Sequence, residues 1–316
     1  MSDLVGKISE ERKGNMGDNI ETLFEIGILE DKVRIYHDES KEALGKSVWG
    51  HGLLFVPERS KESLLRALRE IRQTIGYNGK LRFADISESV YTPKYKCAKA
   101  WIETGTVYLE RDKGCKLSVI FFDTSAANLE LYSGDKKEQK LRFVETVLKM
   151  VLHGSIHYLY NENWRIKLEE IITDGEPWHR KLDEHRIIER IVANVRNYVE
   201  FLPDARIRSV FSDHGDSRCS DAESAELLQL TDLLLGSMIQ TCLKRTMGGS
   251  KRDMISKPVR EVLDKRKRGK GFKNSRHFRS FSVSLATIEN NKWVFNDLLT
   301  KDALYENHQG TLFVEE

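Results

Sequence analysis

Hydrophobic residues in the first part of the chain follow two spacings, one typical of strands and one typical of helices. Residues 33–38 and 47–56 are rich in β-branched and aromatic side chains, as strands are. In residues 61–75 apolar side chains recur every three or four positions, which predicts a helix. Further strands are expected at residues 80–86, 106–109 and 116–122, with a helix at residues 93–103.

From residue 136 onwards, long helical patterns alternate with short strand patterns. Helices are expected at residues 141–160, 181–201 and 222–243, with strands at residues 165–173 and 206–211. Early strands in pairs, followed by this alternation, predict an α/β fold in which helices flank a mixed sheet. Ser220 and Glu223 have the spacing of a capping box, which predicts where the last helix begins.

The charges divide the chain into a mildly acidic body and a basic C-terminal segment. The whole chain has 51 Lys and Arg against 49 Asp and Glu, but residues 244–316 hold 16 against 9. Gly-Gly-Ser at residues 248–250 marks the expected boundary. We therefore expect an N-terminal extension (1–30), a main domain (31–245) and a basic C-terminal segment (246–316).

The sequence favours a cytoplasmic protein that does not enter a membrane. No apolar run reaches the length of about 18 residues that a membrane span needs, and the first residues lack the apolar core of a signal peptide. The four cysteines lie far apart and form no C-x-x-C pair, so we expect reduced thiols.

Basic residues are densest at residues 244–279, which hold 14 Lys and Arg against 3 acidic residues, with aromatic residues nearby. Such a stretch attracts polyanions, and the aromatic neighbours favour a nucleic acid over a merely solvated surface. The residues expected to contact its phosphates are Lys265, Arg266, Lys267, Arg268, Lys270 and Lys273.

Three aspartates occur where an ionised carboxylate is costly unless it is paired or binds a cation. Asp38 ends the first apolar strand, Asp174 ends a later one, and Asp232 lies in a helix that is apolar on most sides. Asp232 shares a small and polar stripe with Gln229 and Gly236, as a helix surface facing a site would. Converging carboxylates are stable mainly around a hard cation such as Mg²⁺ or Mn²⁺, and two such ions can promote phosphodiester cleavage. The alternative for Asp232 is an ion pair with an arginine or a place at a solvent edge.

Two motifs resemble those of a protein family. YHDES (residues 36–40) and QLTDLLLG (residues 229–236) resemble the uncharacterised-domain family numbered 3800, over roughly residues 31–245. That family resembles ribonuclease H-like nucleases, whose sheet carries acidic residues on the first strand, the fourth strand and the last helix.

The resemblance implies a fold, a reaction and a set of site residues. The implied fold is a ribonuclease H-like mixed sheet flanked by helices, here with a basic C-terminal extension. Asp38, Asp174 and Asp232 are the implied ligands of Mg²⁺ or Mn²⁺, with Glu39 assisting catalysis. The implied reaction is metal-dependent cleavage of DNA or RNA, and by association a role in phage defence or as a toxin.

Some assignments stay open in the sequence. Asp123 also ends a strand and is the alternative to Asp174. Glu39 ranks behind Asp38, because successive strand residues point to opposite faces. The charged residue that the family often has in its third strand corresponds best to Lys80 or Arg82.

The histidines are weaker candidates. His214 precedes the acidic helix, where it is either an exposed loop residue or an aid to proton transfer. His153 and His157 have metal-ligand spacing but lack the glutamate of the H-E-x-x-H motif.

The second functional hypothesis is a non-catalytic module of a larger defence complex. Such a module would use the same fold to bind nucleic acid or a partner protein, or to form a homo-oligomer. Metal-dependent degradation of plasmid DNA or RNA discriminates between the two hypotheses.

Overall fold

The computed structural model describes most of the chain between residues 29 and 298. The described residues are 29–40, 48–86, 89–110, 114–123, 129–160, 164–175, 188, 199–243, 250–268, 280–289 and 292–298.

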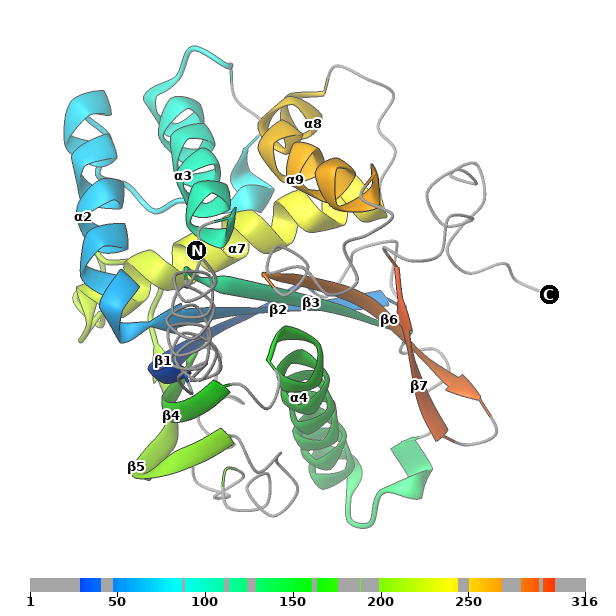
Figure 1. Ribbon diagram of the computed structural model, residues 1–316. Coiled ribbons are helices and arrows are strands. Elements are labelled where there is room, and N and C mark those ends of the chain that lie inside the picture. Colours follow the sequence, from blue (N-terminus) through cyan, green and yellow to red (C-terminus); the bar gives the residue numbers. More distant parts are fainter. Residues whose placement is uncertain are drawn as a thin grey trace, which may run out of the picture.

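A mixed sheet of seven strands forms the middle layer of the described part (Figure 1). Its strands are β1 (Leu29–Ser40), β2 (Val48–Pro57), β3 (Lys116–Asp123), β4 (Trp164–Asp174), β5 (Val199–Val210), β6 (Phe281–Glu289) and β7 (Lys292–Asp297). Their order across the sheet is β5-β4-β1-β2-β3-β6-β7. β1, β2 and β3 form an antiparallel meander, and β4 and β5 continue the sheet parallel to β1. On the other side β6 runs parallel to β3, and β7 runs antiparallel to β6.

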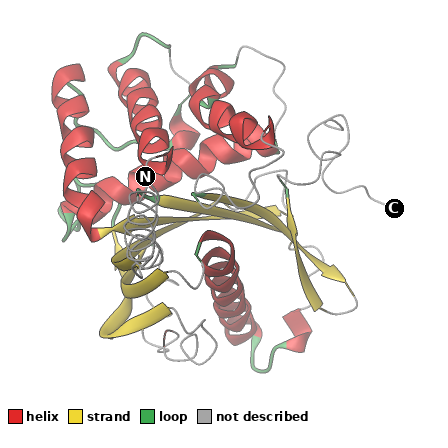
Figure 2. Ribbon diagram, viewed as in Figure 1, coloured by secondary structure: helices red, strands yellow, loops and turns green. Residues whose placement is uncertain are grey.

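Helices cover both faces of the sheet (Figure 2). One face carries α2 (Glu58–Ile75), α3 (Pro93–Glu110), α7 (Ala222–Cys242), α8 (Lys251–Ile255) and α9 (Lys257–Arg268), and the other carries α4 (Lys136–Leu159). Two short 3-10 helices, η1 (Phe83–Asp85) and η2 (Leu129–Leu131), lie in connections. The predicted α/β class, a mixed sheet flanked by helices, is confirmed. Within the described residues, no helix combines the length and the apolar character that crossing a membrane requires.

The alternation of side chains along the strands creates two separate cores. Tyr36 and Leu54 belong to the buried cluster on the α7 face, whereas Ile35 and Phe55 belong to the cluster on the α4 face. This follows from the period of two residues in a strand, which sends neighbours to opposite faces. The alternation also decides which polar residues of β1 can meet α7.

Helix α7 is buried along most of its length, because it lies between the sheet and the outer helices. Its contacts include β1, β2 and α3. The approach to β2 is close, since a Cβ atom on Gly52 would lie 3.1 Å from Cβ of Leu235. The helix begins at Asp221, whose side chain accepts a hydrogen bond from the N–H of Ser224. The predicted capping box at Ser220 is therefore wrong by one residue.

Two predicted strands are helical or irregular in the structure. Residues 106–109 continue helix α3, where the hydroxyl of Thr106 donates to the carbonyl of Glu103. Their β-branched and aromatic side chains suggested a strand, but packing against α7 overrides that preference. Residues 80–86 form an extended stretch followed by η1, since side chains of α7 rather than a neighbouring strand accept their N–H groups.

Two further boundaries concern the second half of the chain. Residues 199–201, expected at the end of a helix, begin strand β5. The C-terminal segment contributes α8 and α9 to the layer of α3 and α7, and β6 and β7 to the sheet. The Gly-Gly pair at the expected boundary lies outside the described residues.

Candidate active site

Three carboxylates meet at the carboxyl ends of β1 and β4, beneath helix α7. β1 and β4 are parallel neighbours, and His37 pairs in register with Thr173, so Asp38 and Asp174 follow at adjacent strand ends. Burial raises the pKa of Asp38 well above its usual range, and the negative charges of Asp232 and Asp174 raise it further. The structure therefore places the three aspartates that the sequence singles out close enough for the charges of Asp174 and Asp232 to act on Asp38.

Asp232 reaches this point from α7 and is held there by backbone. The N–H of Phe83 donates to Oδ2 of Asp232 at 2.6 Å. Burial raises the pKa of Asp232, while this N–H, the positive charges of Arg82 and Lys80 and a hydrogen bond with Asp38 act in the opposite direction. The two carboxyl groups therefore influence each other's ionisation, and burial raises the pKa of both.

Asp174 is oriented by the loop that follows β5. Its Oδ1 accepts the N–H of Gly175 at 2.7 Å and the N–H of Ser212 at 3.2 Å. Its Oδ2 accepts the hydroxyl of Ser212 at 3.0 Å. These donors fix the carboxylate next to Asp38.

No arginine or lysine of the described residues forms an ion pair with Asp38 or Asp232. Among the described residues, Asp232 is therefore not a member of an arginine ion pair, although the charges of Arg82 and Lys80 act on it. Within the described ranges, no three or more His, Cys, Asp or Glu side chains have the arrangement of an assembled metal site. In the structure, backbone N–H groups donate to the carboxylate oxygens. Phe83 donates to Asp232, and Gly175 and Ser212 donate to Asp174.

Gln229 organises the surroundings of the carboxylates, a role that sequence reasoning missed. It is buried, and its Oε1 accepts the N–H of Leu81 at 2.9 Å and a guanidinium N–H of Arg72 at 2.8 Å. Its Nε2 donates to the carbonyl of Ser212 at 2.5 Å and lies 3.2 Å from Nδ1 of His214. The amide thus joins the segment before η1 to the loop that holds Asp174. The signal was present, since Gln229 shares the polar stripe with Asp232.

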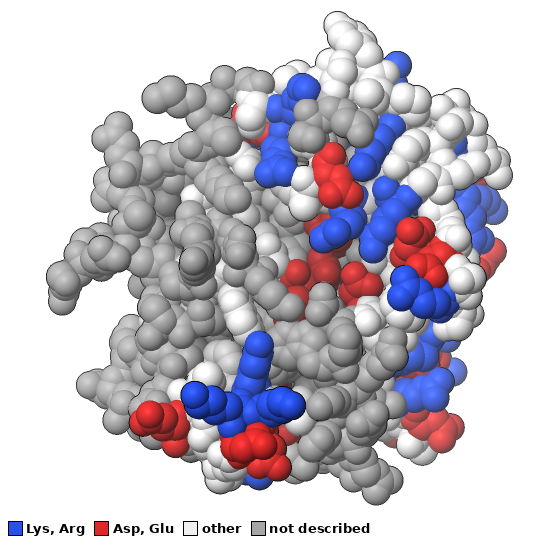
Figure 3. Space-filling model, turned by 180° about the vertical axis from the view of Figure 1, so that it is seen from behind, with Lys and Arg blue, Asp and Glu red and all other residues white. Residues whose placement is uncertain are grey.

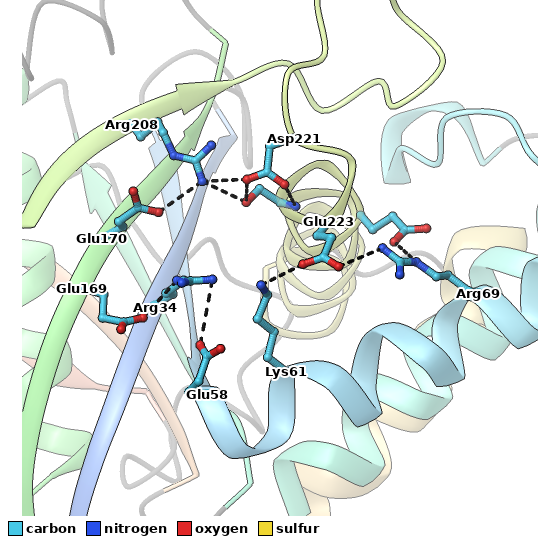
Figure 4. Close-up of polar contacts among 11 residues, drawn as sticks. Arg34, Glu58, Lys61, Arg69, Glu169, Glu170, Arg208, Asp221 and Glu223 are labelled. Atoms are coloured by element: carbon cyan, nitrogen blue, oxygen red, sulfur yellow. Dashed lines mark hydrogen bonds and ion pairs between the residues drawn. The ribbon is translucent and has the colours of Figure 1, made fainter.

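The end of α7 nearest its N-terminus is tied to the strands and to α2 by ion pairs (Figure 4). Arg208 on β5 donates to Glu170 on β4 at 3.2 Å and to Asp221 at 2.8 Å. Lys61 on α2 pairs with Glu223 at 2.8 Å. Hydrogen bonds from Ser224 and the ion pair with Arg208 lower the pKa of Asp221 to about 2, although burial opposes them. This network fixes α7 across the parallel strands, and with it the position of Asp232.

Glu39 lies on a different face from the three aspartates. It pairs in register with His51, on the α4 face, where the stacked His37 and His51 rings also lie. Its backbone N–H donates to the carboxylate of Asp38. The backbone of Glu39 thus contributes to the carboxylate group, while strand alternation directs its side chain to the other face.

The remaining sequence candidates lie elsewhere or outside the description. Lys265 lies on α9 and pairs with Glu110 at 3.0 Å, whereas the side chains of Arg266, Lys267 and Arg268 are not described. Lys270 and Lys273 lie outside the described residues, as does the side chain of Asp123, the last residue of β3. His153 belongs to α4, on the opposite face of the sheet, and the side chain of His157 is not described.

Basic residues do approach the aspartates, but from a segment that composition did not indicate. Lys80 and Arg82 precede η1, and their charges act on Asp232. On one face of the molecule, acidic side chains gather near the middle and Lys and Arg side chains lie beside them (Figure 3).

Comparison with protein-family models, with curated proteins and with solved structures finds no match to this chain.

Proposed function

We propose that this protein is a metal-dependent nuclease with a ribonuclease H-like fold. The observation that carries the proposal is the meeting of Asp38, Asp174 and Asp232, which come from two parallel strand ends and one buried helix. Like-charged groups in a partly buried position repel one another, so such a cluster is most stable with a cation between its members.

The topology supports the same proposal. The resemblance implies a mixed sheet, and the sheet here combines an antiparallel meander of three strands with two strands parallel to the first. The acidic residues stand on the first strand, the fourth strand and α7. The first two positions are those that the resemblance implies, whereas the third is implied for the last helix and α7 is followed by α8 and α9. Fold likeness alone does not establish an activity, so the chemistry of the site bears the argument.

The donor set fits Mg²⁺ or Mn²⁺, because these ions prefer carboxylate oxygens. Asp38, Asp174 and Asp232 would hold the metal, which when bound lowers the pKa of water and stabilises the oxygen leaving the phosphodiester. The residues of the chain provide orientation: Ser212 and Gly175 keep Asp174 in position, and the N–H of Phe83 does the same for Asp232.

The pKa values indicate how the site takes up a cation. Burial raises the pKa of both Asp38 and Asp232. Binding of a divalent cation favours the ionised form of both, so uptake of metal should release protons at pH values near these raised pKa values. DNA or RNA is the proposed substrate, and contacts of residues 265–273 with its phosphates stay a prediction. Phage defence, toxicity and a cytoplasmic location also stay predictions.

The test compares cleavage by the wild-type protein and Asp232→Asn. Plasmid DNA and a structured RNA are incubated with Mg²⁺, with Mn²⁺ or with EDTA. Asp204→Asn is the matched control, because it removes the same charge from an exposed position of β5. We expect metal-dependent cleavage that falls by at least a hundredfold in Asp232→Asn and persists in Asp204→Asn. Equal cleavage by both variants would overturn the proposal, and binding of nucleic acid without any cleavage would favour the non-catalytic module.

A further inference from the structure

The connection between α2 and α3 carries two cations beside the carboxylates. Residues 80–83 run alongside α7, with Leu81 and Phe83 buried, Arg82 exposed and Lys80 partly exposed. The alternation results from an extended backbone, as the φ of −137° and ψ of 136° at Arg82 indicate. Lys80 and Arg82 therefore point away from the core on the side next to Asp232.

Buried side chains hold this segment in place. Arg72 donates to the carbonyls of Tyr77 at 3.2 Å and Gly79 at 2.8 Å. Gln229 accepts the N–H of Leu81. With the bond from Phe83 to Asp232, four hydrogen bonds fix the backbone on both sides of Lys80 and Arg82. The two cations are thus presented from an ordered support, which lowers the entropy lost when they bind a ligand.

Neither cation has a direct partner among the described residues. Both charges reach Asp232, and Lys80 also lowers the pKa of Asp216. Yet neither forms an ion pair or a side-chain hydrogen bond with any residue in the described ranges.

The basic residues around them are occupied. Arg218 pairs with Asp216 at 2.5 Å, and Lys94 pairs with Asp85 at 3.6 Å. Arg252 donates to the carbonyl of Ala84. Lys80 and Arg82 thus differ from these basic neighbours in having no ion-pair or side-chain hydrogen-bond partner among the residues that the structure describes.

We propose that Lys80 and Arg82 bind a phosphate of the nucleic-acid strand next to the bond that is cut. In the proposed site, carboxylates would hold a divalent metal ion, and the basic side chains of Lys80 and Arg82 lie beside them. Such a site suits a ligand that is anionic and also binds metal, as a phosphodiester is and does. The guanidinium of Arg82 can donate two parallel hydrogen bonds to phosphate oxygens, and Lys80 adds a point charge. This inference rests on the proposed function, and it adds a substrate-binding element from the connection between α2 and α3.

Binding in the absence of cleavage tests the assignment. Fluorescence anisotropy of a labelled single-stranded oligonucleotide, as DNA and as RNA, is measured in EDTA over a range of salt concentrations. The test variant is Lys80→Ala/Arg82→Ala. The control is Arg66→Ala/Lys99→Ala, which removes the same charge from exposed positions of α2 and α3.

We expect the test variant to bind at least tenfold more weakly than wild type, and the control to bind within twofold of it. Loss of the contact with this phosphate lowers the salt slope of log K by about 0.7 for a single strand. The single variant Arg82→Lys should bind more tightly than the double alanine variant but more weakly than wild type. It keeps the positive charge but cannot donate the two parallel hydrogen bonds of a guanidinium.

The competing explanation is that both cations only balance the charge of the aspartates. In that case the double variant would lose thermal stability while its affinity and salt slope matched the control, and the inference would be overturned. Failure of the proposed function is a separate outcome: cleavage would then survive Asp232→Asn, whatever Lys80→Ala/Arg82→Ala does to binding.

Discussion

The backbone N–H of Phe83 donates to the carboxylate of Asp232 at 2.6 Å, which joins the connection between α2 and α3 to the acidic site. The ring of Phe83 lies against α7 at Gly236, where a Cβ atom would come within 2.2 Å of the ring carbon Cγ. The position of Asp232 therefore depends on a glycine one helical turn further along α7.

Gly236→Ala should displace Phe83 and weaken the site. The added Cβ atom meets a ring and its Cβ rather than the end of a flexible side chain, so the neighbour has little freedom to give way. Overpacking of this kind costs about 1–3 kcal/mol, against a gain of about 1 kcal/mol in helix propensity. We expect a lower melting temperature and reduced metal-dependent cleavage.

The control for this substitution is Gly215→Ala. Gly215 is exposed, and the nearest atom to an added Cβ would be 3.5 Å away, an ordinary contact. Melting temperature and cleavage are measured for both variants. A Gly236→Ala protein as stable and as active as Gly215→Ala would mean that Phe83 does not position Asp232.

Asp38→Asn should stabilise the metal-free protein at neutral pH. The pKa of Asp38 is raised on folding, so the group is protonated in both states below about pH 4 and contributes nothing there. As pH rises above that value, the unfolded chain ionises more readily than the folded one, and wild type loses stability that Asp38→Asn retains. Urea unfolding at pH 4 and pH 7 in EDTA measures this difference.

Divalent metal should make wild type more stable than Asp38→Asn at neutral pH. Mg²⁺ bound to the folded state stabilises wild type by an amount that grows with the logarithm of the Mg²⁺ concentration once this exceeds the dissociation constant, and it should have much less effect on Asp38→Asn. An Asp38→Asn protein less stable than wild type at pH 7 in EDTA would instead identify Asp38 as a partner in a structural ion pair.

Arg208→Met should loosen the hold of the strands on α7. The substitution leaves Glu170 and Asp221 without their shared partner, at side chains that are 20% and 28% exposed. Because these positions are partly solvated, we expect the free energy of unfolding to fall by about 1–2 kcal/mol, which is less than the full cost of breaking a buried pair. Arg206→Met is the control, since its side chain is 60% exposed and lies 3.6 Å from Glu170.

The effect of Arg208→Met should depend on pH. The pKa of Asp221 is lowered to about 2 on folding, so its contribution is complete above about pH 4 and is lost as pH falls towards 2. Urea unfolding at pH 7 and pH 3 measures the difference between the variants. If the difference in unfolding free energy between the variants is the same at pH 7 and pH 3, the stabilising effect of Arg208 does not come from its ion pair with Asp221.

The sequence predicted those parts of the fold and site that depend on local pattern. The strand that contains Asp38 and the helix around Asp232 follow from the composition and spacing of a few neighbouring residues. The polar stripe on α7 was also readable, because Gln229 and Asp232 interrupt an apolar helix at a regular spacing.

The parts that sequence did not predict depend on contacts far apart in the chain. Residues 80–86 have the composition of a strand, but their N–H groups bond to Gln229 and Asp232, which lie about 150 residues further on. The pairing of β6 with β3 joins residues more than 160 positions apart, and no local pattern encodes such a register. Lys80 and Arg82 were a minor candidate for the same reason, since their nearness to Asp232 results from that long-range anchoring.

The most direct test of a metal site at the three aspartates is anomalous diffraction from crystals of the full chain soaked in Mn²⁺. We predict an anomalous difference peak within coordination distance of carboxylate oxygens from Asp38 and Asp232, with Asp174 nearby, and no peak in crystals of Asp232→Asn. Crystals that contain Mn²⁺ elsewhere but none between these carboxylates would contradict the account.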